Sequence, residues 1–160
     1  MAMPGRIDYF NDPNAPAANS LVPSVNVIVT DDAGRLLMIR RTDNDNWAVP
    51  GGAIDLGESM IDAAVRETLE ETGIVCEITG IDGIYTDPRH VIHYTSNDEV
   101  RQEFSIVLTG RSTGGEPTPS NESSEVHWVE PDAVIDLQMH RSMRARVEHY
   151  LKGDGTPHLG

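Results

Sequence analysis

The chain has 160 residues, 38% of them hydrophobic, which is the size of one globular domain and enough to bury a core. Its 12 Lys and Arg against 26 Asp and Glu give a formal net charge of −14 at pH 7, which disfavours long nucleic acids and anionic membranes as partners. The single cysteine, Cys76, rules out an internal disulfide, and because we find neither a secretory signal nor an apolar run that could span a bilayer, we expect a cytoplasmic protein.

The N-terminal part of the chain is expected to form an arm followed by a β-hairpin. Residues 1–20 carry several prolines and show no hydrophobic periodicity, which is typical of an arm on the surface. The domain itself is expected over residues 21–160. Two β-branched or apolar segments, 22–30 and 35–40, flank a turn signal and predict a hairpin.

The remainder of the chain alternates helical and strand-like segments. A helix is expected over 59–72, because Ser59 and Asp62 have capping-box spacing and Gly73 is a stop signal. Strands are then expected at 74–79, 81–85, 91–94, 103–109 and 126–129, with a long loop over 110–124 and a mostly helical segment over 131–150. Strands on both sides of one early helix, with a second helical segment at the end, predict an α/β fold, specifically an α/β/α sandwich around a mixed β-sheet.

Three glutamates occupy one face of the expected helix over 59–72. Glu67, Glu70 and Glu71 are offset by three and four positions, so their side chains project from the same side. Their mutual repulsion costs an isolated helix about a few tenths of a kcal/mol per pair unless cations bind there. Mg²⁺ and Mn²⁺ prefer such oxygen ligands, although a plain solvated charged surface is the alternative.

The opposite face of this helix is expected to pack on the sheet. Its members lie within a narrow arc and comprise Ile61, Val65, Thr68, Leu69 and Thr72. Such packing would hold the glutamates in a fixed geometry. Arg66 flanks the acidic face and could orient a carboxylate through two hydrogen bonds, or form an ordinary surface salt bridge.

The segment from Gly52 to Ile74 resembles the signature of a known family, the Nudix box. In that box a glycine is followed by five residues, a glutamate, seven residues, Arg-Glu, an aliphatic residue, any residue, Glu-Glu, any residue, a glycine and an aliphatic residue. The matching positions here are Gly52, Glu58, Arg66, Glu67, Glu70, Glu71, Gly73 and Ile74. Thr68 departs from the usual aliphatic residue, but its methyl group can still pack inward. The resemblance extends from about residue 21 to about residue 150.

The resemblance implies a Nudix pyrophosphohydrolase of the MutT-like or ADP-ribose pyrophosphatase-like kind. Such an enzyme uses Mg²⁺ or Mn²⁺ to activate a water molecule that cleaves the diphosphate linkage of a nucleoside diphosphate or triphosphate derivative. The implied metal ligands are Glu67, Glu70, Glu71 and the backbone carbonyl of Gly51, and the implied supporting residues are Gly52, Glu58 and Arg66. Among later glutamates, Glu122 is the preferred extra ligand or general base, ahead of Glu125 and Glu103.

Four further residues are candidates for contacts with substrate. Arg40 and Arg41 end a predicted strand and could bind phosphates, or could be exposed strand-end charges. Arg89 and His90 lie in a predicted loop. For His90, a surface histidine is favoured over a ligand contact.

Other functions remain open at this stage. A Nudix-like nucleotide sensor without catalytic activity is one alternative, although such domains commonly lose the box acids and this chain keeps them. A prenyl-diphosphate isomerase would need an active-site cysteine, whereas Cys76 is expected to be buried. RNA decapping is disfavoured by the acidic composition. A homodimer is expected only by analogy.

Overall fold

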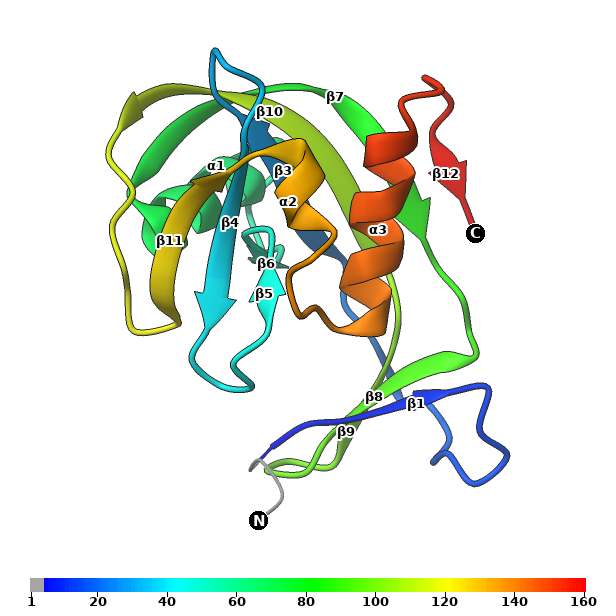
Figure 1. Ribbon diagram of the computed structural model, residues 1–160. Helices are drawn as coiled ribbons and strands as arrows, with labels where there is room; N and C mark the ends of the chain where they lie inside the picture. Colours follow the sequence, from blue (N-terminus) through cyan, green and yellow to red (C-terminus); the bar gives the residue numbers. More distant parts are fainter. Residues whose placement is uncertain (1–4) are drawn as a thin grey trace.

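The computed structural model describes residues 5–160 and shows two β-sheets and three helices (Figure 1). The eight-stranded main sheet has the order β11-β4-β3-β10-β7-β12, with the short strands β5 and β6 paired to β4 and β3. Its strands are β3 (Ser24–Thr30), β4 (Leu36–Arg41), β5 (Trp47–Ala48), β6 (Gly51–Ala53), β7 (Ile74–Tyr85), β10 (Ser105–Gly115), β11 (Ser123–Val129) and β12 (His158–Leu159). The sheet is mixed, because β3 runs parallel to β10 while β7 and β10 are antiparallel.

The three helices cover both faces of the main sheet, which confirms the predicted α/β fold. They are α1 (Met60–Thr72), α2 (Pro131–Val134) and α3 (Arg141–Lys152). Alternation along β4 divides the core, since Leu37 and Ile39 pack with α1 whereas Leu36 and Met38 pack with α2 and α3. Successive strand side chains point to opposite faces, so one apolar strand supplies both halves of the core.

The face of α1 that packs on the sheet differs from the predicted one. Ile61 and Leu69 are each 48% exposed, so the expectation that they face the sheet is wrong. Thr68 and Thr72 are buried as predicted, and Ala63 and Ala64 pack on the sheet in place of Ile61 and Leu69. The hydroxyl of Thr68 donates to the Ala64 carbonyl at 2.8 Å. Val65 is half-buried against the same core. Small side chains let the helix lie close to the strands, where larger apolar ones would not fit.

The predicted hairpin, helix and stop signals are confirmed, whereas the predicted long loop is wrong. β10 continues through residues 110–115, because its glycines pair with the start of β7 across several register shifts. The segments predicted at 74–79 and 81–85 form the single strand β7. The segment 131–150 is helical only at its two ends, since the backbone near Met139 pairs with Trp47.

A second, four-stranded sheet lies at one end of the main sheet and is lowest in Figure 1. Its order is β1-β8-β9-β2, from β1 (Ile7–Phe10), β2 (Ser20–Leu21), β8 (His90–Tyr94) and β9 (Glu99–Gln102). The predicted arm therefore contains a strand, β1, which pairs antiparallel with β8, and residues 1–4 lie outside the described residues. Within residues 5–160, none of the helices has the length and apolar character needed to span a membrane.

Candidate active site

A cavity of about 660 Å³ lies where the small sheet meets α1, the β4–β5 loop and the start of α3. Of the residues singled out from the sequence, those that line it are Arg41, Gly51, Gly52, Glu67, Glu70, His90, Glu103 and Glu122. Those not among the lining residues are Arg40, Glu58, Arg66, Glu71, Arg89 and Glu125. The structure therefore brings most of the predicted site together around one space.

Two capping structures hold α1 in place. The Ser59 side chain accepts from the Asp62 amide while the Asp62 side chain accepts from the Ser59 amide, a complete capping box. At the other end Gly73 adopts φ 76°, and a Cβ there would lie 2.7 Å from the Glu116 carbonyl oxygen. Only glycine fits this left-handed, crowded position.

Glu67 and Glu71 form a carboxyl pair beside the cavity. Glu71 is 4% exposed, and its carboxyl lies close to that of Glu67. Burial, followed by the neighbouring Glu67, raises the pKa of Glu71 to about 9. Burial likewise raises the pKa of Glu67. Two acids held this closely away from water are unfavourable as anions unless a cation lies with them.

Arg66 ties the helix acids to the preceding loop. Its Nε and Nη2 donate to Glu58 at 2.6 and 2.8 Å, and Nη1 donates to Glu67 at 3.0 Å and Glu70 at 3.2 Å. Arg66 and the Asp55 amide lower the pKa of Glu58 to about 2. Arg66 thereby orients Glu67, and its Nη1 also holds the exposed Glu70.

Gly51 and Gly52 lie in strand β6 and not in a plain turn. They pair with Asn26 and Val25 of β3. A Cβ on Gly52 would lie 2.5 Å from Glu67 Oε1, and one on Gly51 would overlap the Val25 carbonyl. Glycine at both positions lets the backbone approach β3 and the Glu67 carboxylate closely.

The donor set fits a hard divalent cation in part. Among residues 5–160, no three His, Cys, Asp or Glu side chains converge closely enough to form a complete metal site. Glu67 and Glu71 do converge, and Mg²⁺ is commonly held by one or two carboxylates together with water and substrate phosphates. Glu70 would have to leave Arg66 before it could join them.

The three later glutamates have different surroundings. Glu122 is exposed, lines the cavity and acts electrostatically on Glu71. Glu125 accepts from Arg40 at 2.9 Å. Glu103 is buried and accepts from Arg146 at 2.6 Å. Only Glu122 therefore combines exposure with proximity to the acid pair.

The candidate substrate-binding arginines differ in whether they line the cavity. Arg41 lines the cavity, and its charge acts on Glu71. Arg40 is bound to Glu125 and Asp45. Arg89 is bound to the neighbouring Asp87 and lies outside the cavity lining.

His90 is 5% exposed, so the preference for a surface histidine is wrong. Its Nε2 lies 3.0 Å from Asp8 Oδ2, and its Nδ1 lies 3.5 Å from Glu103 Oε1. Arg146 of α3 completes this buried cluster by binding Glu103 and Asn26. Asp8 and Arg146 were missed from the sequence. For Asp8 the signal was the alternation of polar residues before Phe10, whereas no local signal marks Arg146.

Comparisons with known proteins agree with this geometry. The model of the NUDIX domain matches residues 20–150. A MutT-like protein of Streptomyces ambofaciens is 33% identical over 153 residues, covering 94% of this chain and 90% of that protein. A putative 8-oxo-dGTP diphosphatase of Bacillus subtilis (strain 168) is 34% identical over 106 residues, covering 66% of this chain and 64% of that protein.

Solved structures show the same fold. The crystal structure of the MutT protein from Methanosarcina mazei Go1 matches with a TM-score of 0.68 at 22% identity, covering 85% of this chain and 96% of that one. Because the family model spans most of the sequence and a relative aligned over 94% of the chain is 33% identical, the chain belongs to the Nudix family and is a hydrolase that acts on phosphorus-containing anhydrides.

Proposed function

We propose that this chain is a divalent-metal-dependent pyrophosphohydrolase that cleaves the diphosphate linkage of a nucleoside diphosphate or triphosphate derivative. The observation that carries the proposal is the Glu67–Glu71 carboxyl pair, in which Glu67 lines the cavity and lies against Gly52 of β6 while Glu71 is buried beside it. The relatives of this chain support this substrate class, because one is a putative 8-oxo-dGTP diphosphatase and another is an ADP-ribose pyrophosphatase.

The proposed site contains metal ligands, a residue that orients them and residues that act on the substrate. Glu67 and Glu71 would hold the cation, with Glu70 and the Gly51 carbonyl as further ligands. Arg66, itself held by Glu58, keeps Glu67 in place. A bound Mg²⁺ or Mn²⁺ would polarise the phosphate and activate water. Arg41 and Glu122 line the cavity, where Arg41 would bind a substrate phosphate and Glu122 would accept a proton.

The competing functions have less support. Cys76 is buried in β7 and does not line the cavity, which argues against a prenyl-diphosphate isomerase. Retention of Glu67, Glu70 and Glu71 argues against a sensor. We also propose a domain over residues 21–160 with the arm attached through β1. A cytoplasmic location and a homodimer stay predictions.

One panel of substrates tests the proposal. Nucleoside triphosphates, ADP-ribose, nucleotide sugars and dinucleoside polyphosphates would be assayed with Mg²⁺ and with Mn²⁺, before and after exhaustive chelation. We expect hydrolysis of at least one class, abolished by chelation and restored by the metal. Full activity after chelation, or no hydrolysis of any class, would overturn the proposal.

A further inference from the structure

Two arginine–aspartate pairs of the same design line the cavity. Arg6 donates to Asp8 through Nε at 2.7 Å and Nη2 at 3.1 Å. Arg41 donates to Asp43 through Nε at 2.9 Å and Nη2 at 2.7 Å. In each pair the aspartate lies two residues after the arginine and binds one edge of the guanidinium, which sets its orientation.

The two pairs are close enough to act on each other. The charge of Arg6 reaches both Arg41 and Asp43, although β1 and β4 belong to different sheets. Arg41 also interacts with Glu71. Arg41 therefore links the acid pair of α1 to the small sheet, where Arg6 lies.

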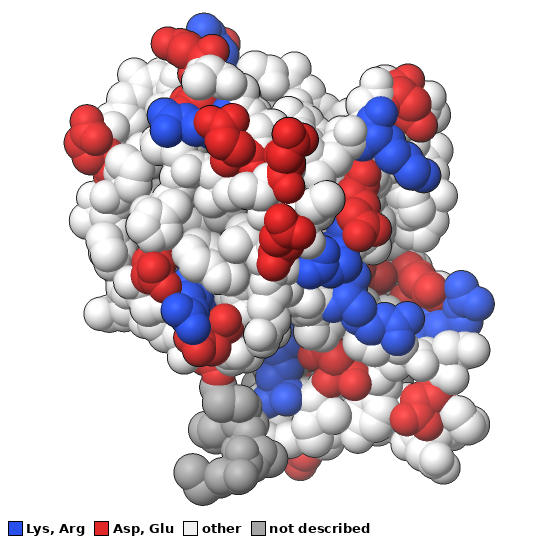
Figure 2. Space-filling view, viewed as in Figure 1, with Lys and Arg blue, Asp and Glu red and all other residues white. Residues whose placement is uncertain are grey.

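Arginines are numerous at this cavity, since four of the 12 Lys and Arg of the chain line it, although the net charge of the chain is −14. Figure 2 shows several basic side chains around the lower end of α3 beside the small sheet. The lining also has six carboxylates, of which Glu67, Glu70 and Glu122 belong to the proposed metal end. The repulsion between Arg6 and Arg41 is unfavourable, and an anion bound between them would relieve it.

Arg6 lies directly before the strand β1. β1 pairs with β8 over four positions. Asp8 is bound by His90 at 3.0 Å, and the Phe10 ring stacks on the His90 ring at 4.3 Å between centroids. Arg6 also lies outside the segment that the family model matches, residues 20–150. Arg6 is therefore held next to a paired strand, outside the matched segment.

We propose that Arg6, together with Arg41, binds a substrate phosphate beyond the two phosphates that flank the cleaved bond. The reacting diphosphate would lie at the Glu67–Glu71 end, with Arg41 next and Arg6 beyond it. A nucleoside triphosphate has a third phosphate for this subsite, whereas ADP-ribose and other diphosphate diesters do not. The enzyme accordingly selects nucleoside triphosphates, an inference that rests on the proposed function.

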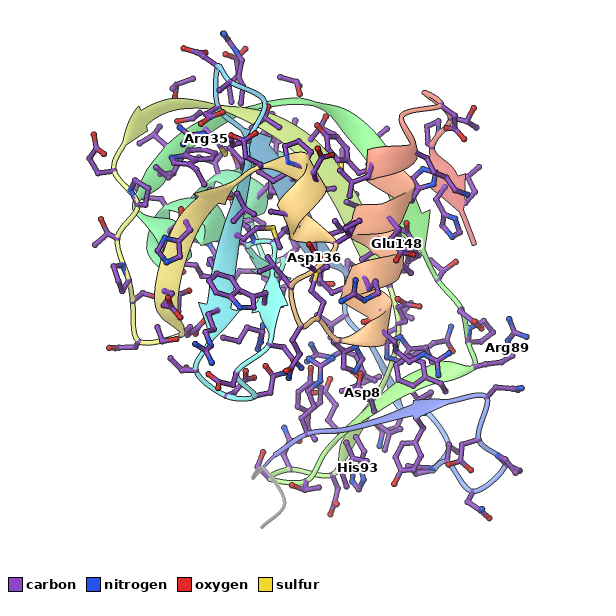
Figure 3. All side chains as sticks on the ribbon, in the orientation of Figure 1. Asp8, Arg35, Arg89, His93, Asp136 and Glu148 are labelled. Carbon is purple, nitrogen blue, oxygen red and sulfur yellow. The ribbon has the colours of Figure 1, made fainter. Side chains whose placement is uncertain are left out.

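The test compares Arg6→Gln with a matched control, Arg35→Gln. Arg35 binds Asp31 at the same 2.7 Å and is equally exposed, at 41%. It lies in the β3–β4 turn at the opposite end of the molecule from Asp8 (Figure 3) and does not line the cavity. Steady-state constants would be measured with Mg²⁺ for a nucleoside triphosphate and for ADP-ribose, with thermal melts as a check on folding.

Arg6→Gln should raise KM for the triphosphate about tenfold or more, the size of one lost charge-assisted hydrogen bond, with kcat little changed. KM for ADP-ribose should change less than about twofold, and Arg6→Lys should recover part of the loss. Arg35→Gln should leave both substrates unaffected. An equal loss on both substrates, or no loss on the triphosphate, would overturn the subsite.

A binding measurement separates this inference from the proposed function. Inorganic tripolyphosphate and pyrophosphate would be titrated into wild type and Arg6→Gln in Mg²⁺ by calorimetry, which requires no turnover. We expect Arg6→Gln to weaken tripolyphosphate about tenfold and pyrophosphate much less. Equal weakening of both anions would overturn the subsite even if hydrolysis is observed. If the chain hydrolyses no substrate but Arg6→Gln weakens tripolyphosphate more than pyrophosphate, the proposed function is wrong and the subsite is supported.

Discussion

The ion pair between Arg146 and Glu103 lies where water hardly reaches, and replacing Arg146 with methionine tests how strongly it holds α3 to the small-sheet junction. The two side chains are 8% and 7% exposed and their charged atoms are 2.6 Å apart. Removing one partner of such a pair leaves an uncompensated buried charge, which costs about 3–5 kcal/mol. His90, at 3.5 Å, is the remaining cationic neighbour of Glu103.

Urea unfolding at pH 7 would measure this cost, with Arg111→Met as the control. Arg111 forms an ion pair of similar length, 2.8 Å, with Glu77, but the side chains are 64% and 57% exposed, so the control should cost at most about 1 kcal/mol. The double variant Arg146→Met with Glu103→Gln should lose less unfolding free energy than the two single variants lose together, by about 1–3 kcal/mol. A cost for Arg146→Met no larger than for Arg111→Met would refute the reasoning.

Three further predictions follow from the fold and the site. Leu69→Ala should lower the free energy of unfolding by only about 1 kcal/mol, because the Leu69 side chain is half exposed. Ala64→Leu should lower it by about 1–3 kcal/mol, because the larger side chain overpacks the buried face. Chemical denaturation would show the reverse order if Leu69 faced the sheet. Gly52→Ala should lower turnover strongly and the melting temperature only slightly, because a Cβ at this position meets the Glu67 carboxylate. An unchanged turnover would contradict that contact. Burial alone would lower the pKa of His90, but hydrogen bonds to Asp8 and Glu103 outweigh it and raise that pKa, with His140 and Arg146 as the other charged neighbours. The stability that His90 contributes should therefore be complete below about pH 6.5 and be lost as pH rises through the higher folded pKa, so the difference in unfolding free energy between wild type and His90→Gln should shrink from pH 5.5 to 8.5.

Local signals in the sequence predicted the elements that local chemistry determines. The capping box at Ser59 and the left-handed glycine at residue 73 define both ends of α1 within a few residues. The turn after residue 30 predicted the β3–β4 hairpin in the same way. The spacing of the box acids predicted that Glu67, Glu70 and Glu71 share one face, and in the structure Glu67 lies close to Glu71 while Glu70 binds Arg66.

Long-range pairing determines what the sequence did not show. The arm contains β1 because β8, more than eighty residues away, offers it an edge. β10 extends through glycines because β7 lies alongside. The α1 face was mispredicted because hydrophobicity favoured Leu69, whereas the short distance to the sheet selects alanine and threonine.

The Mg²⁺-dependent initial rate of Glu71→Gln tests the central claim most directly, with Glu77→Gln as the control on an exposed strand position. Metal activation of phosphate and water contributes several kcal/mol, and about 1.4 kcal/mol corresponds to tenfold in rate. We predict that Glu71→Gln remains folded but hydrolyses the preferred substrate at least about a hundredfold more slowly at saturating Mg²⁺, while Glu77→Gln matches wild type. A wild-type rate for Glu71→Gln would contradict a metal-dependent reaction at the Glu67–Glu71 pair.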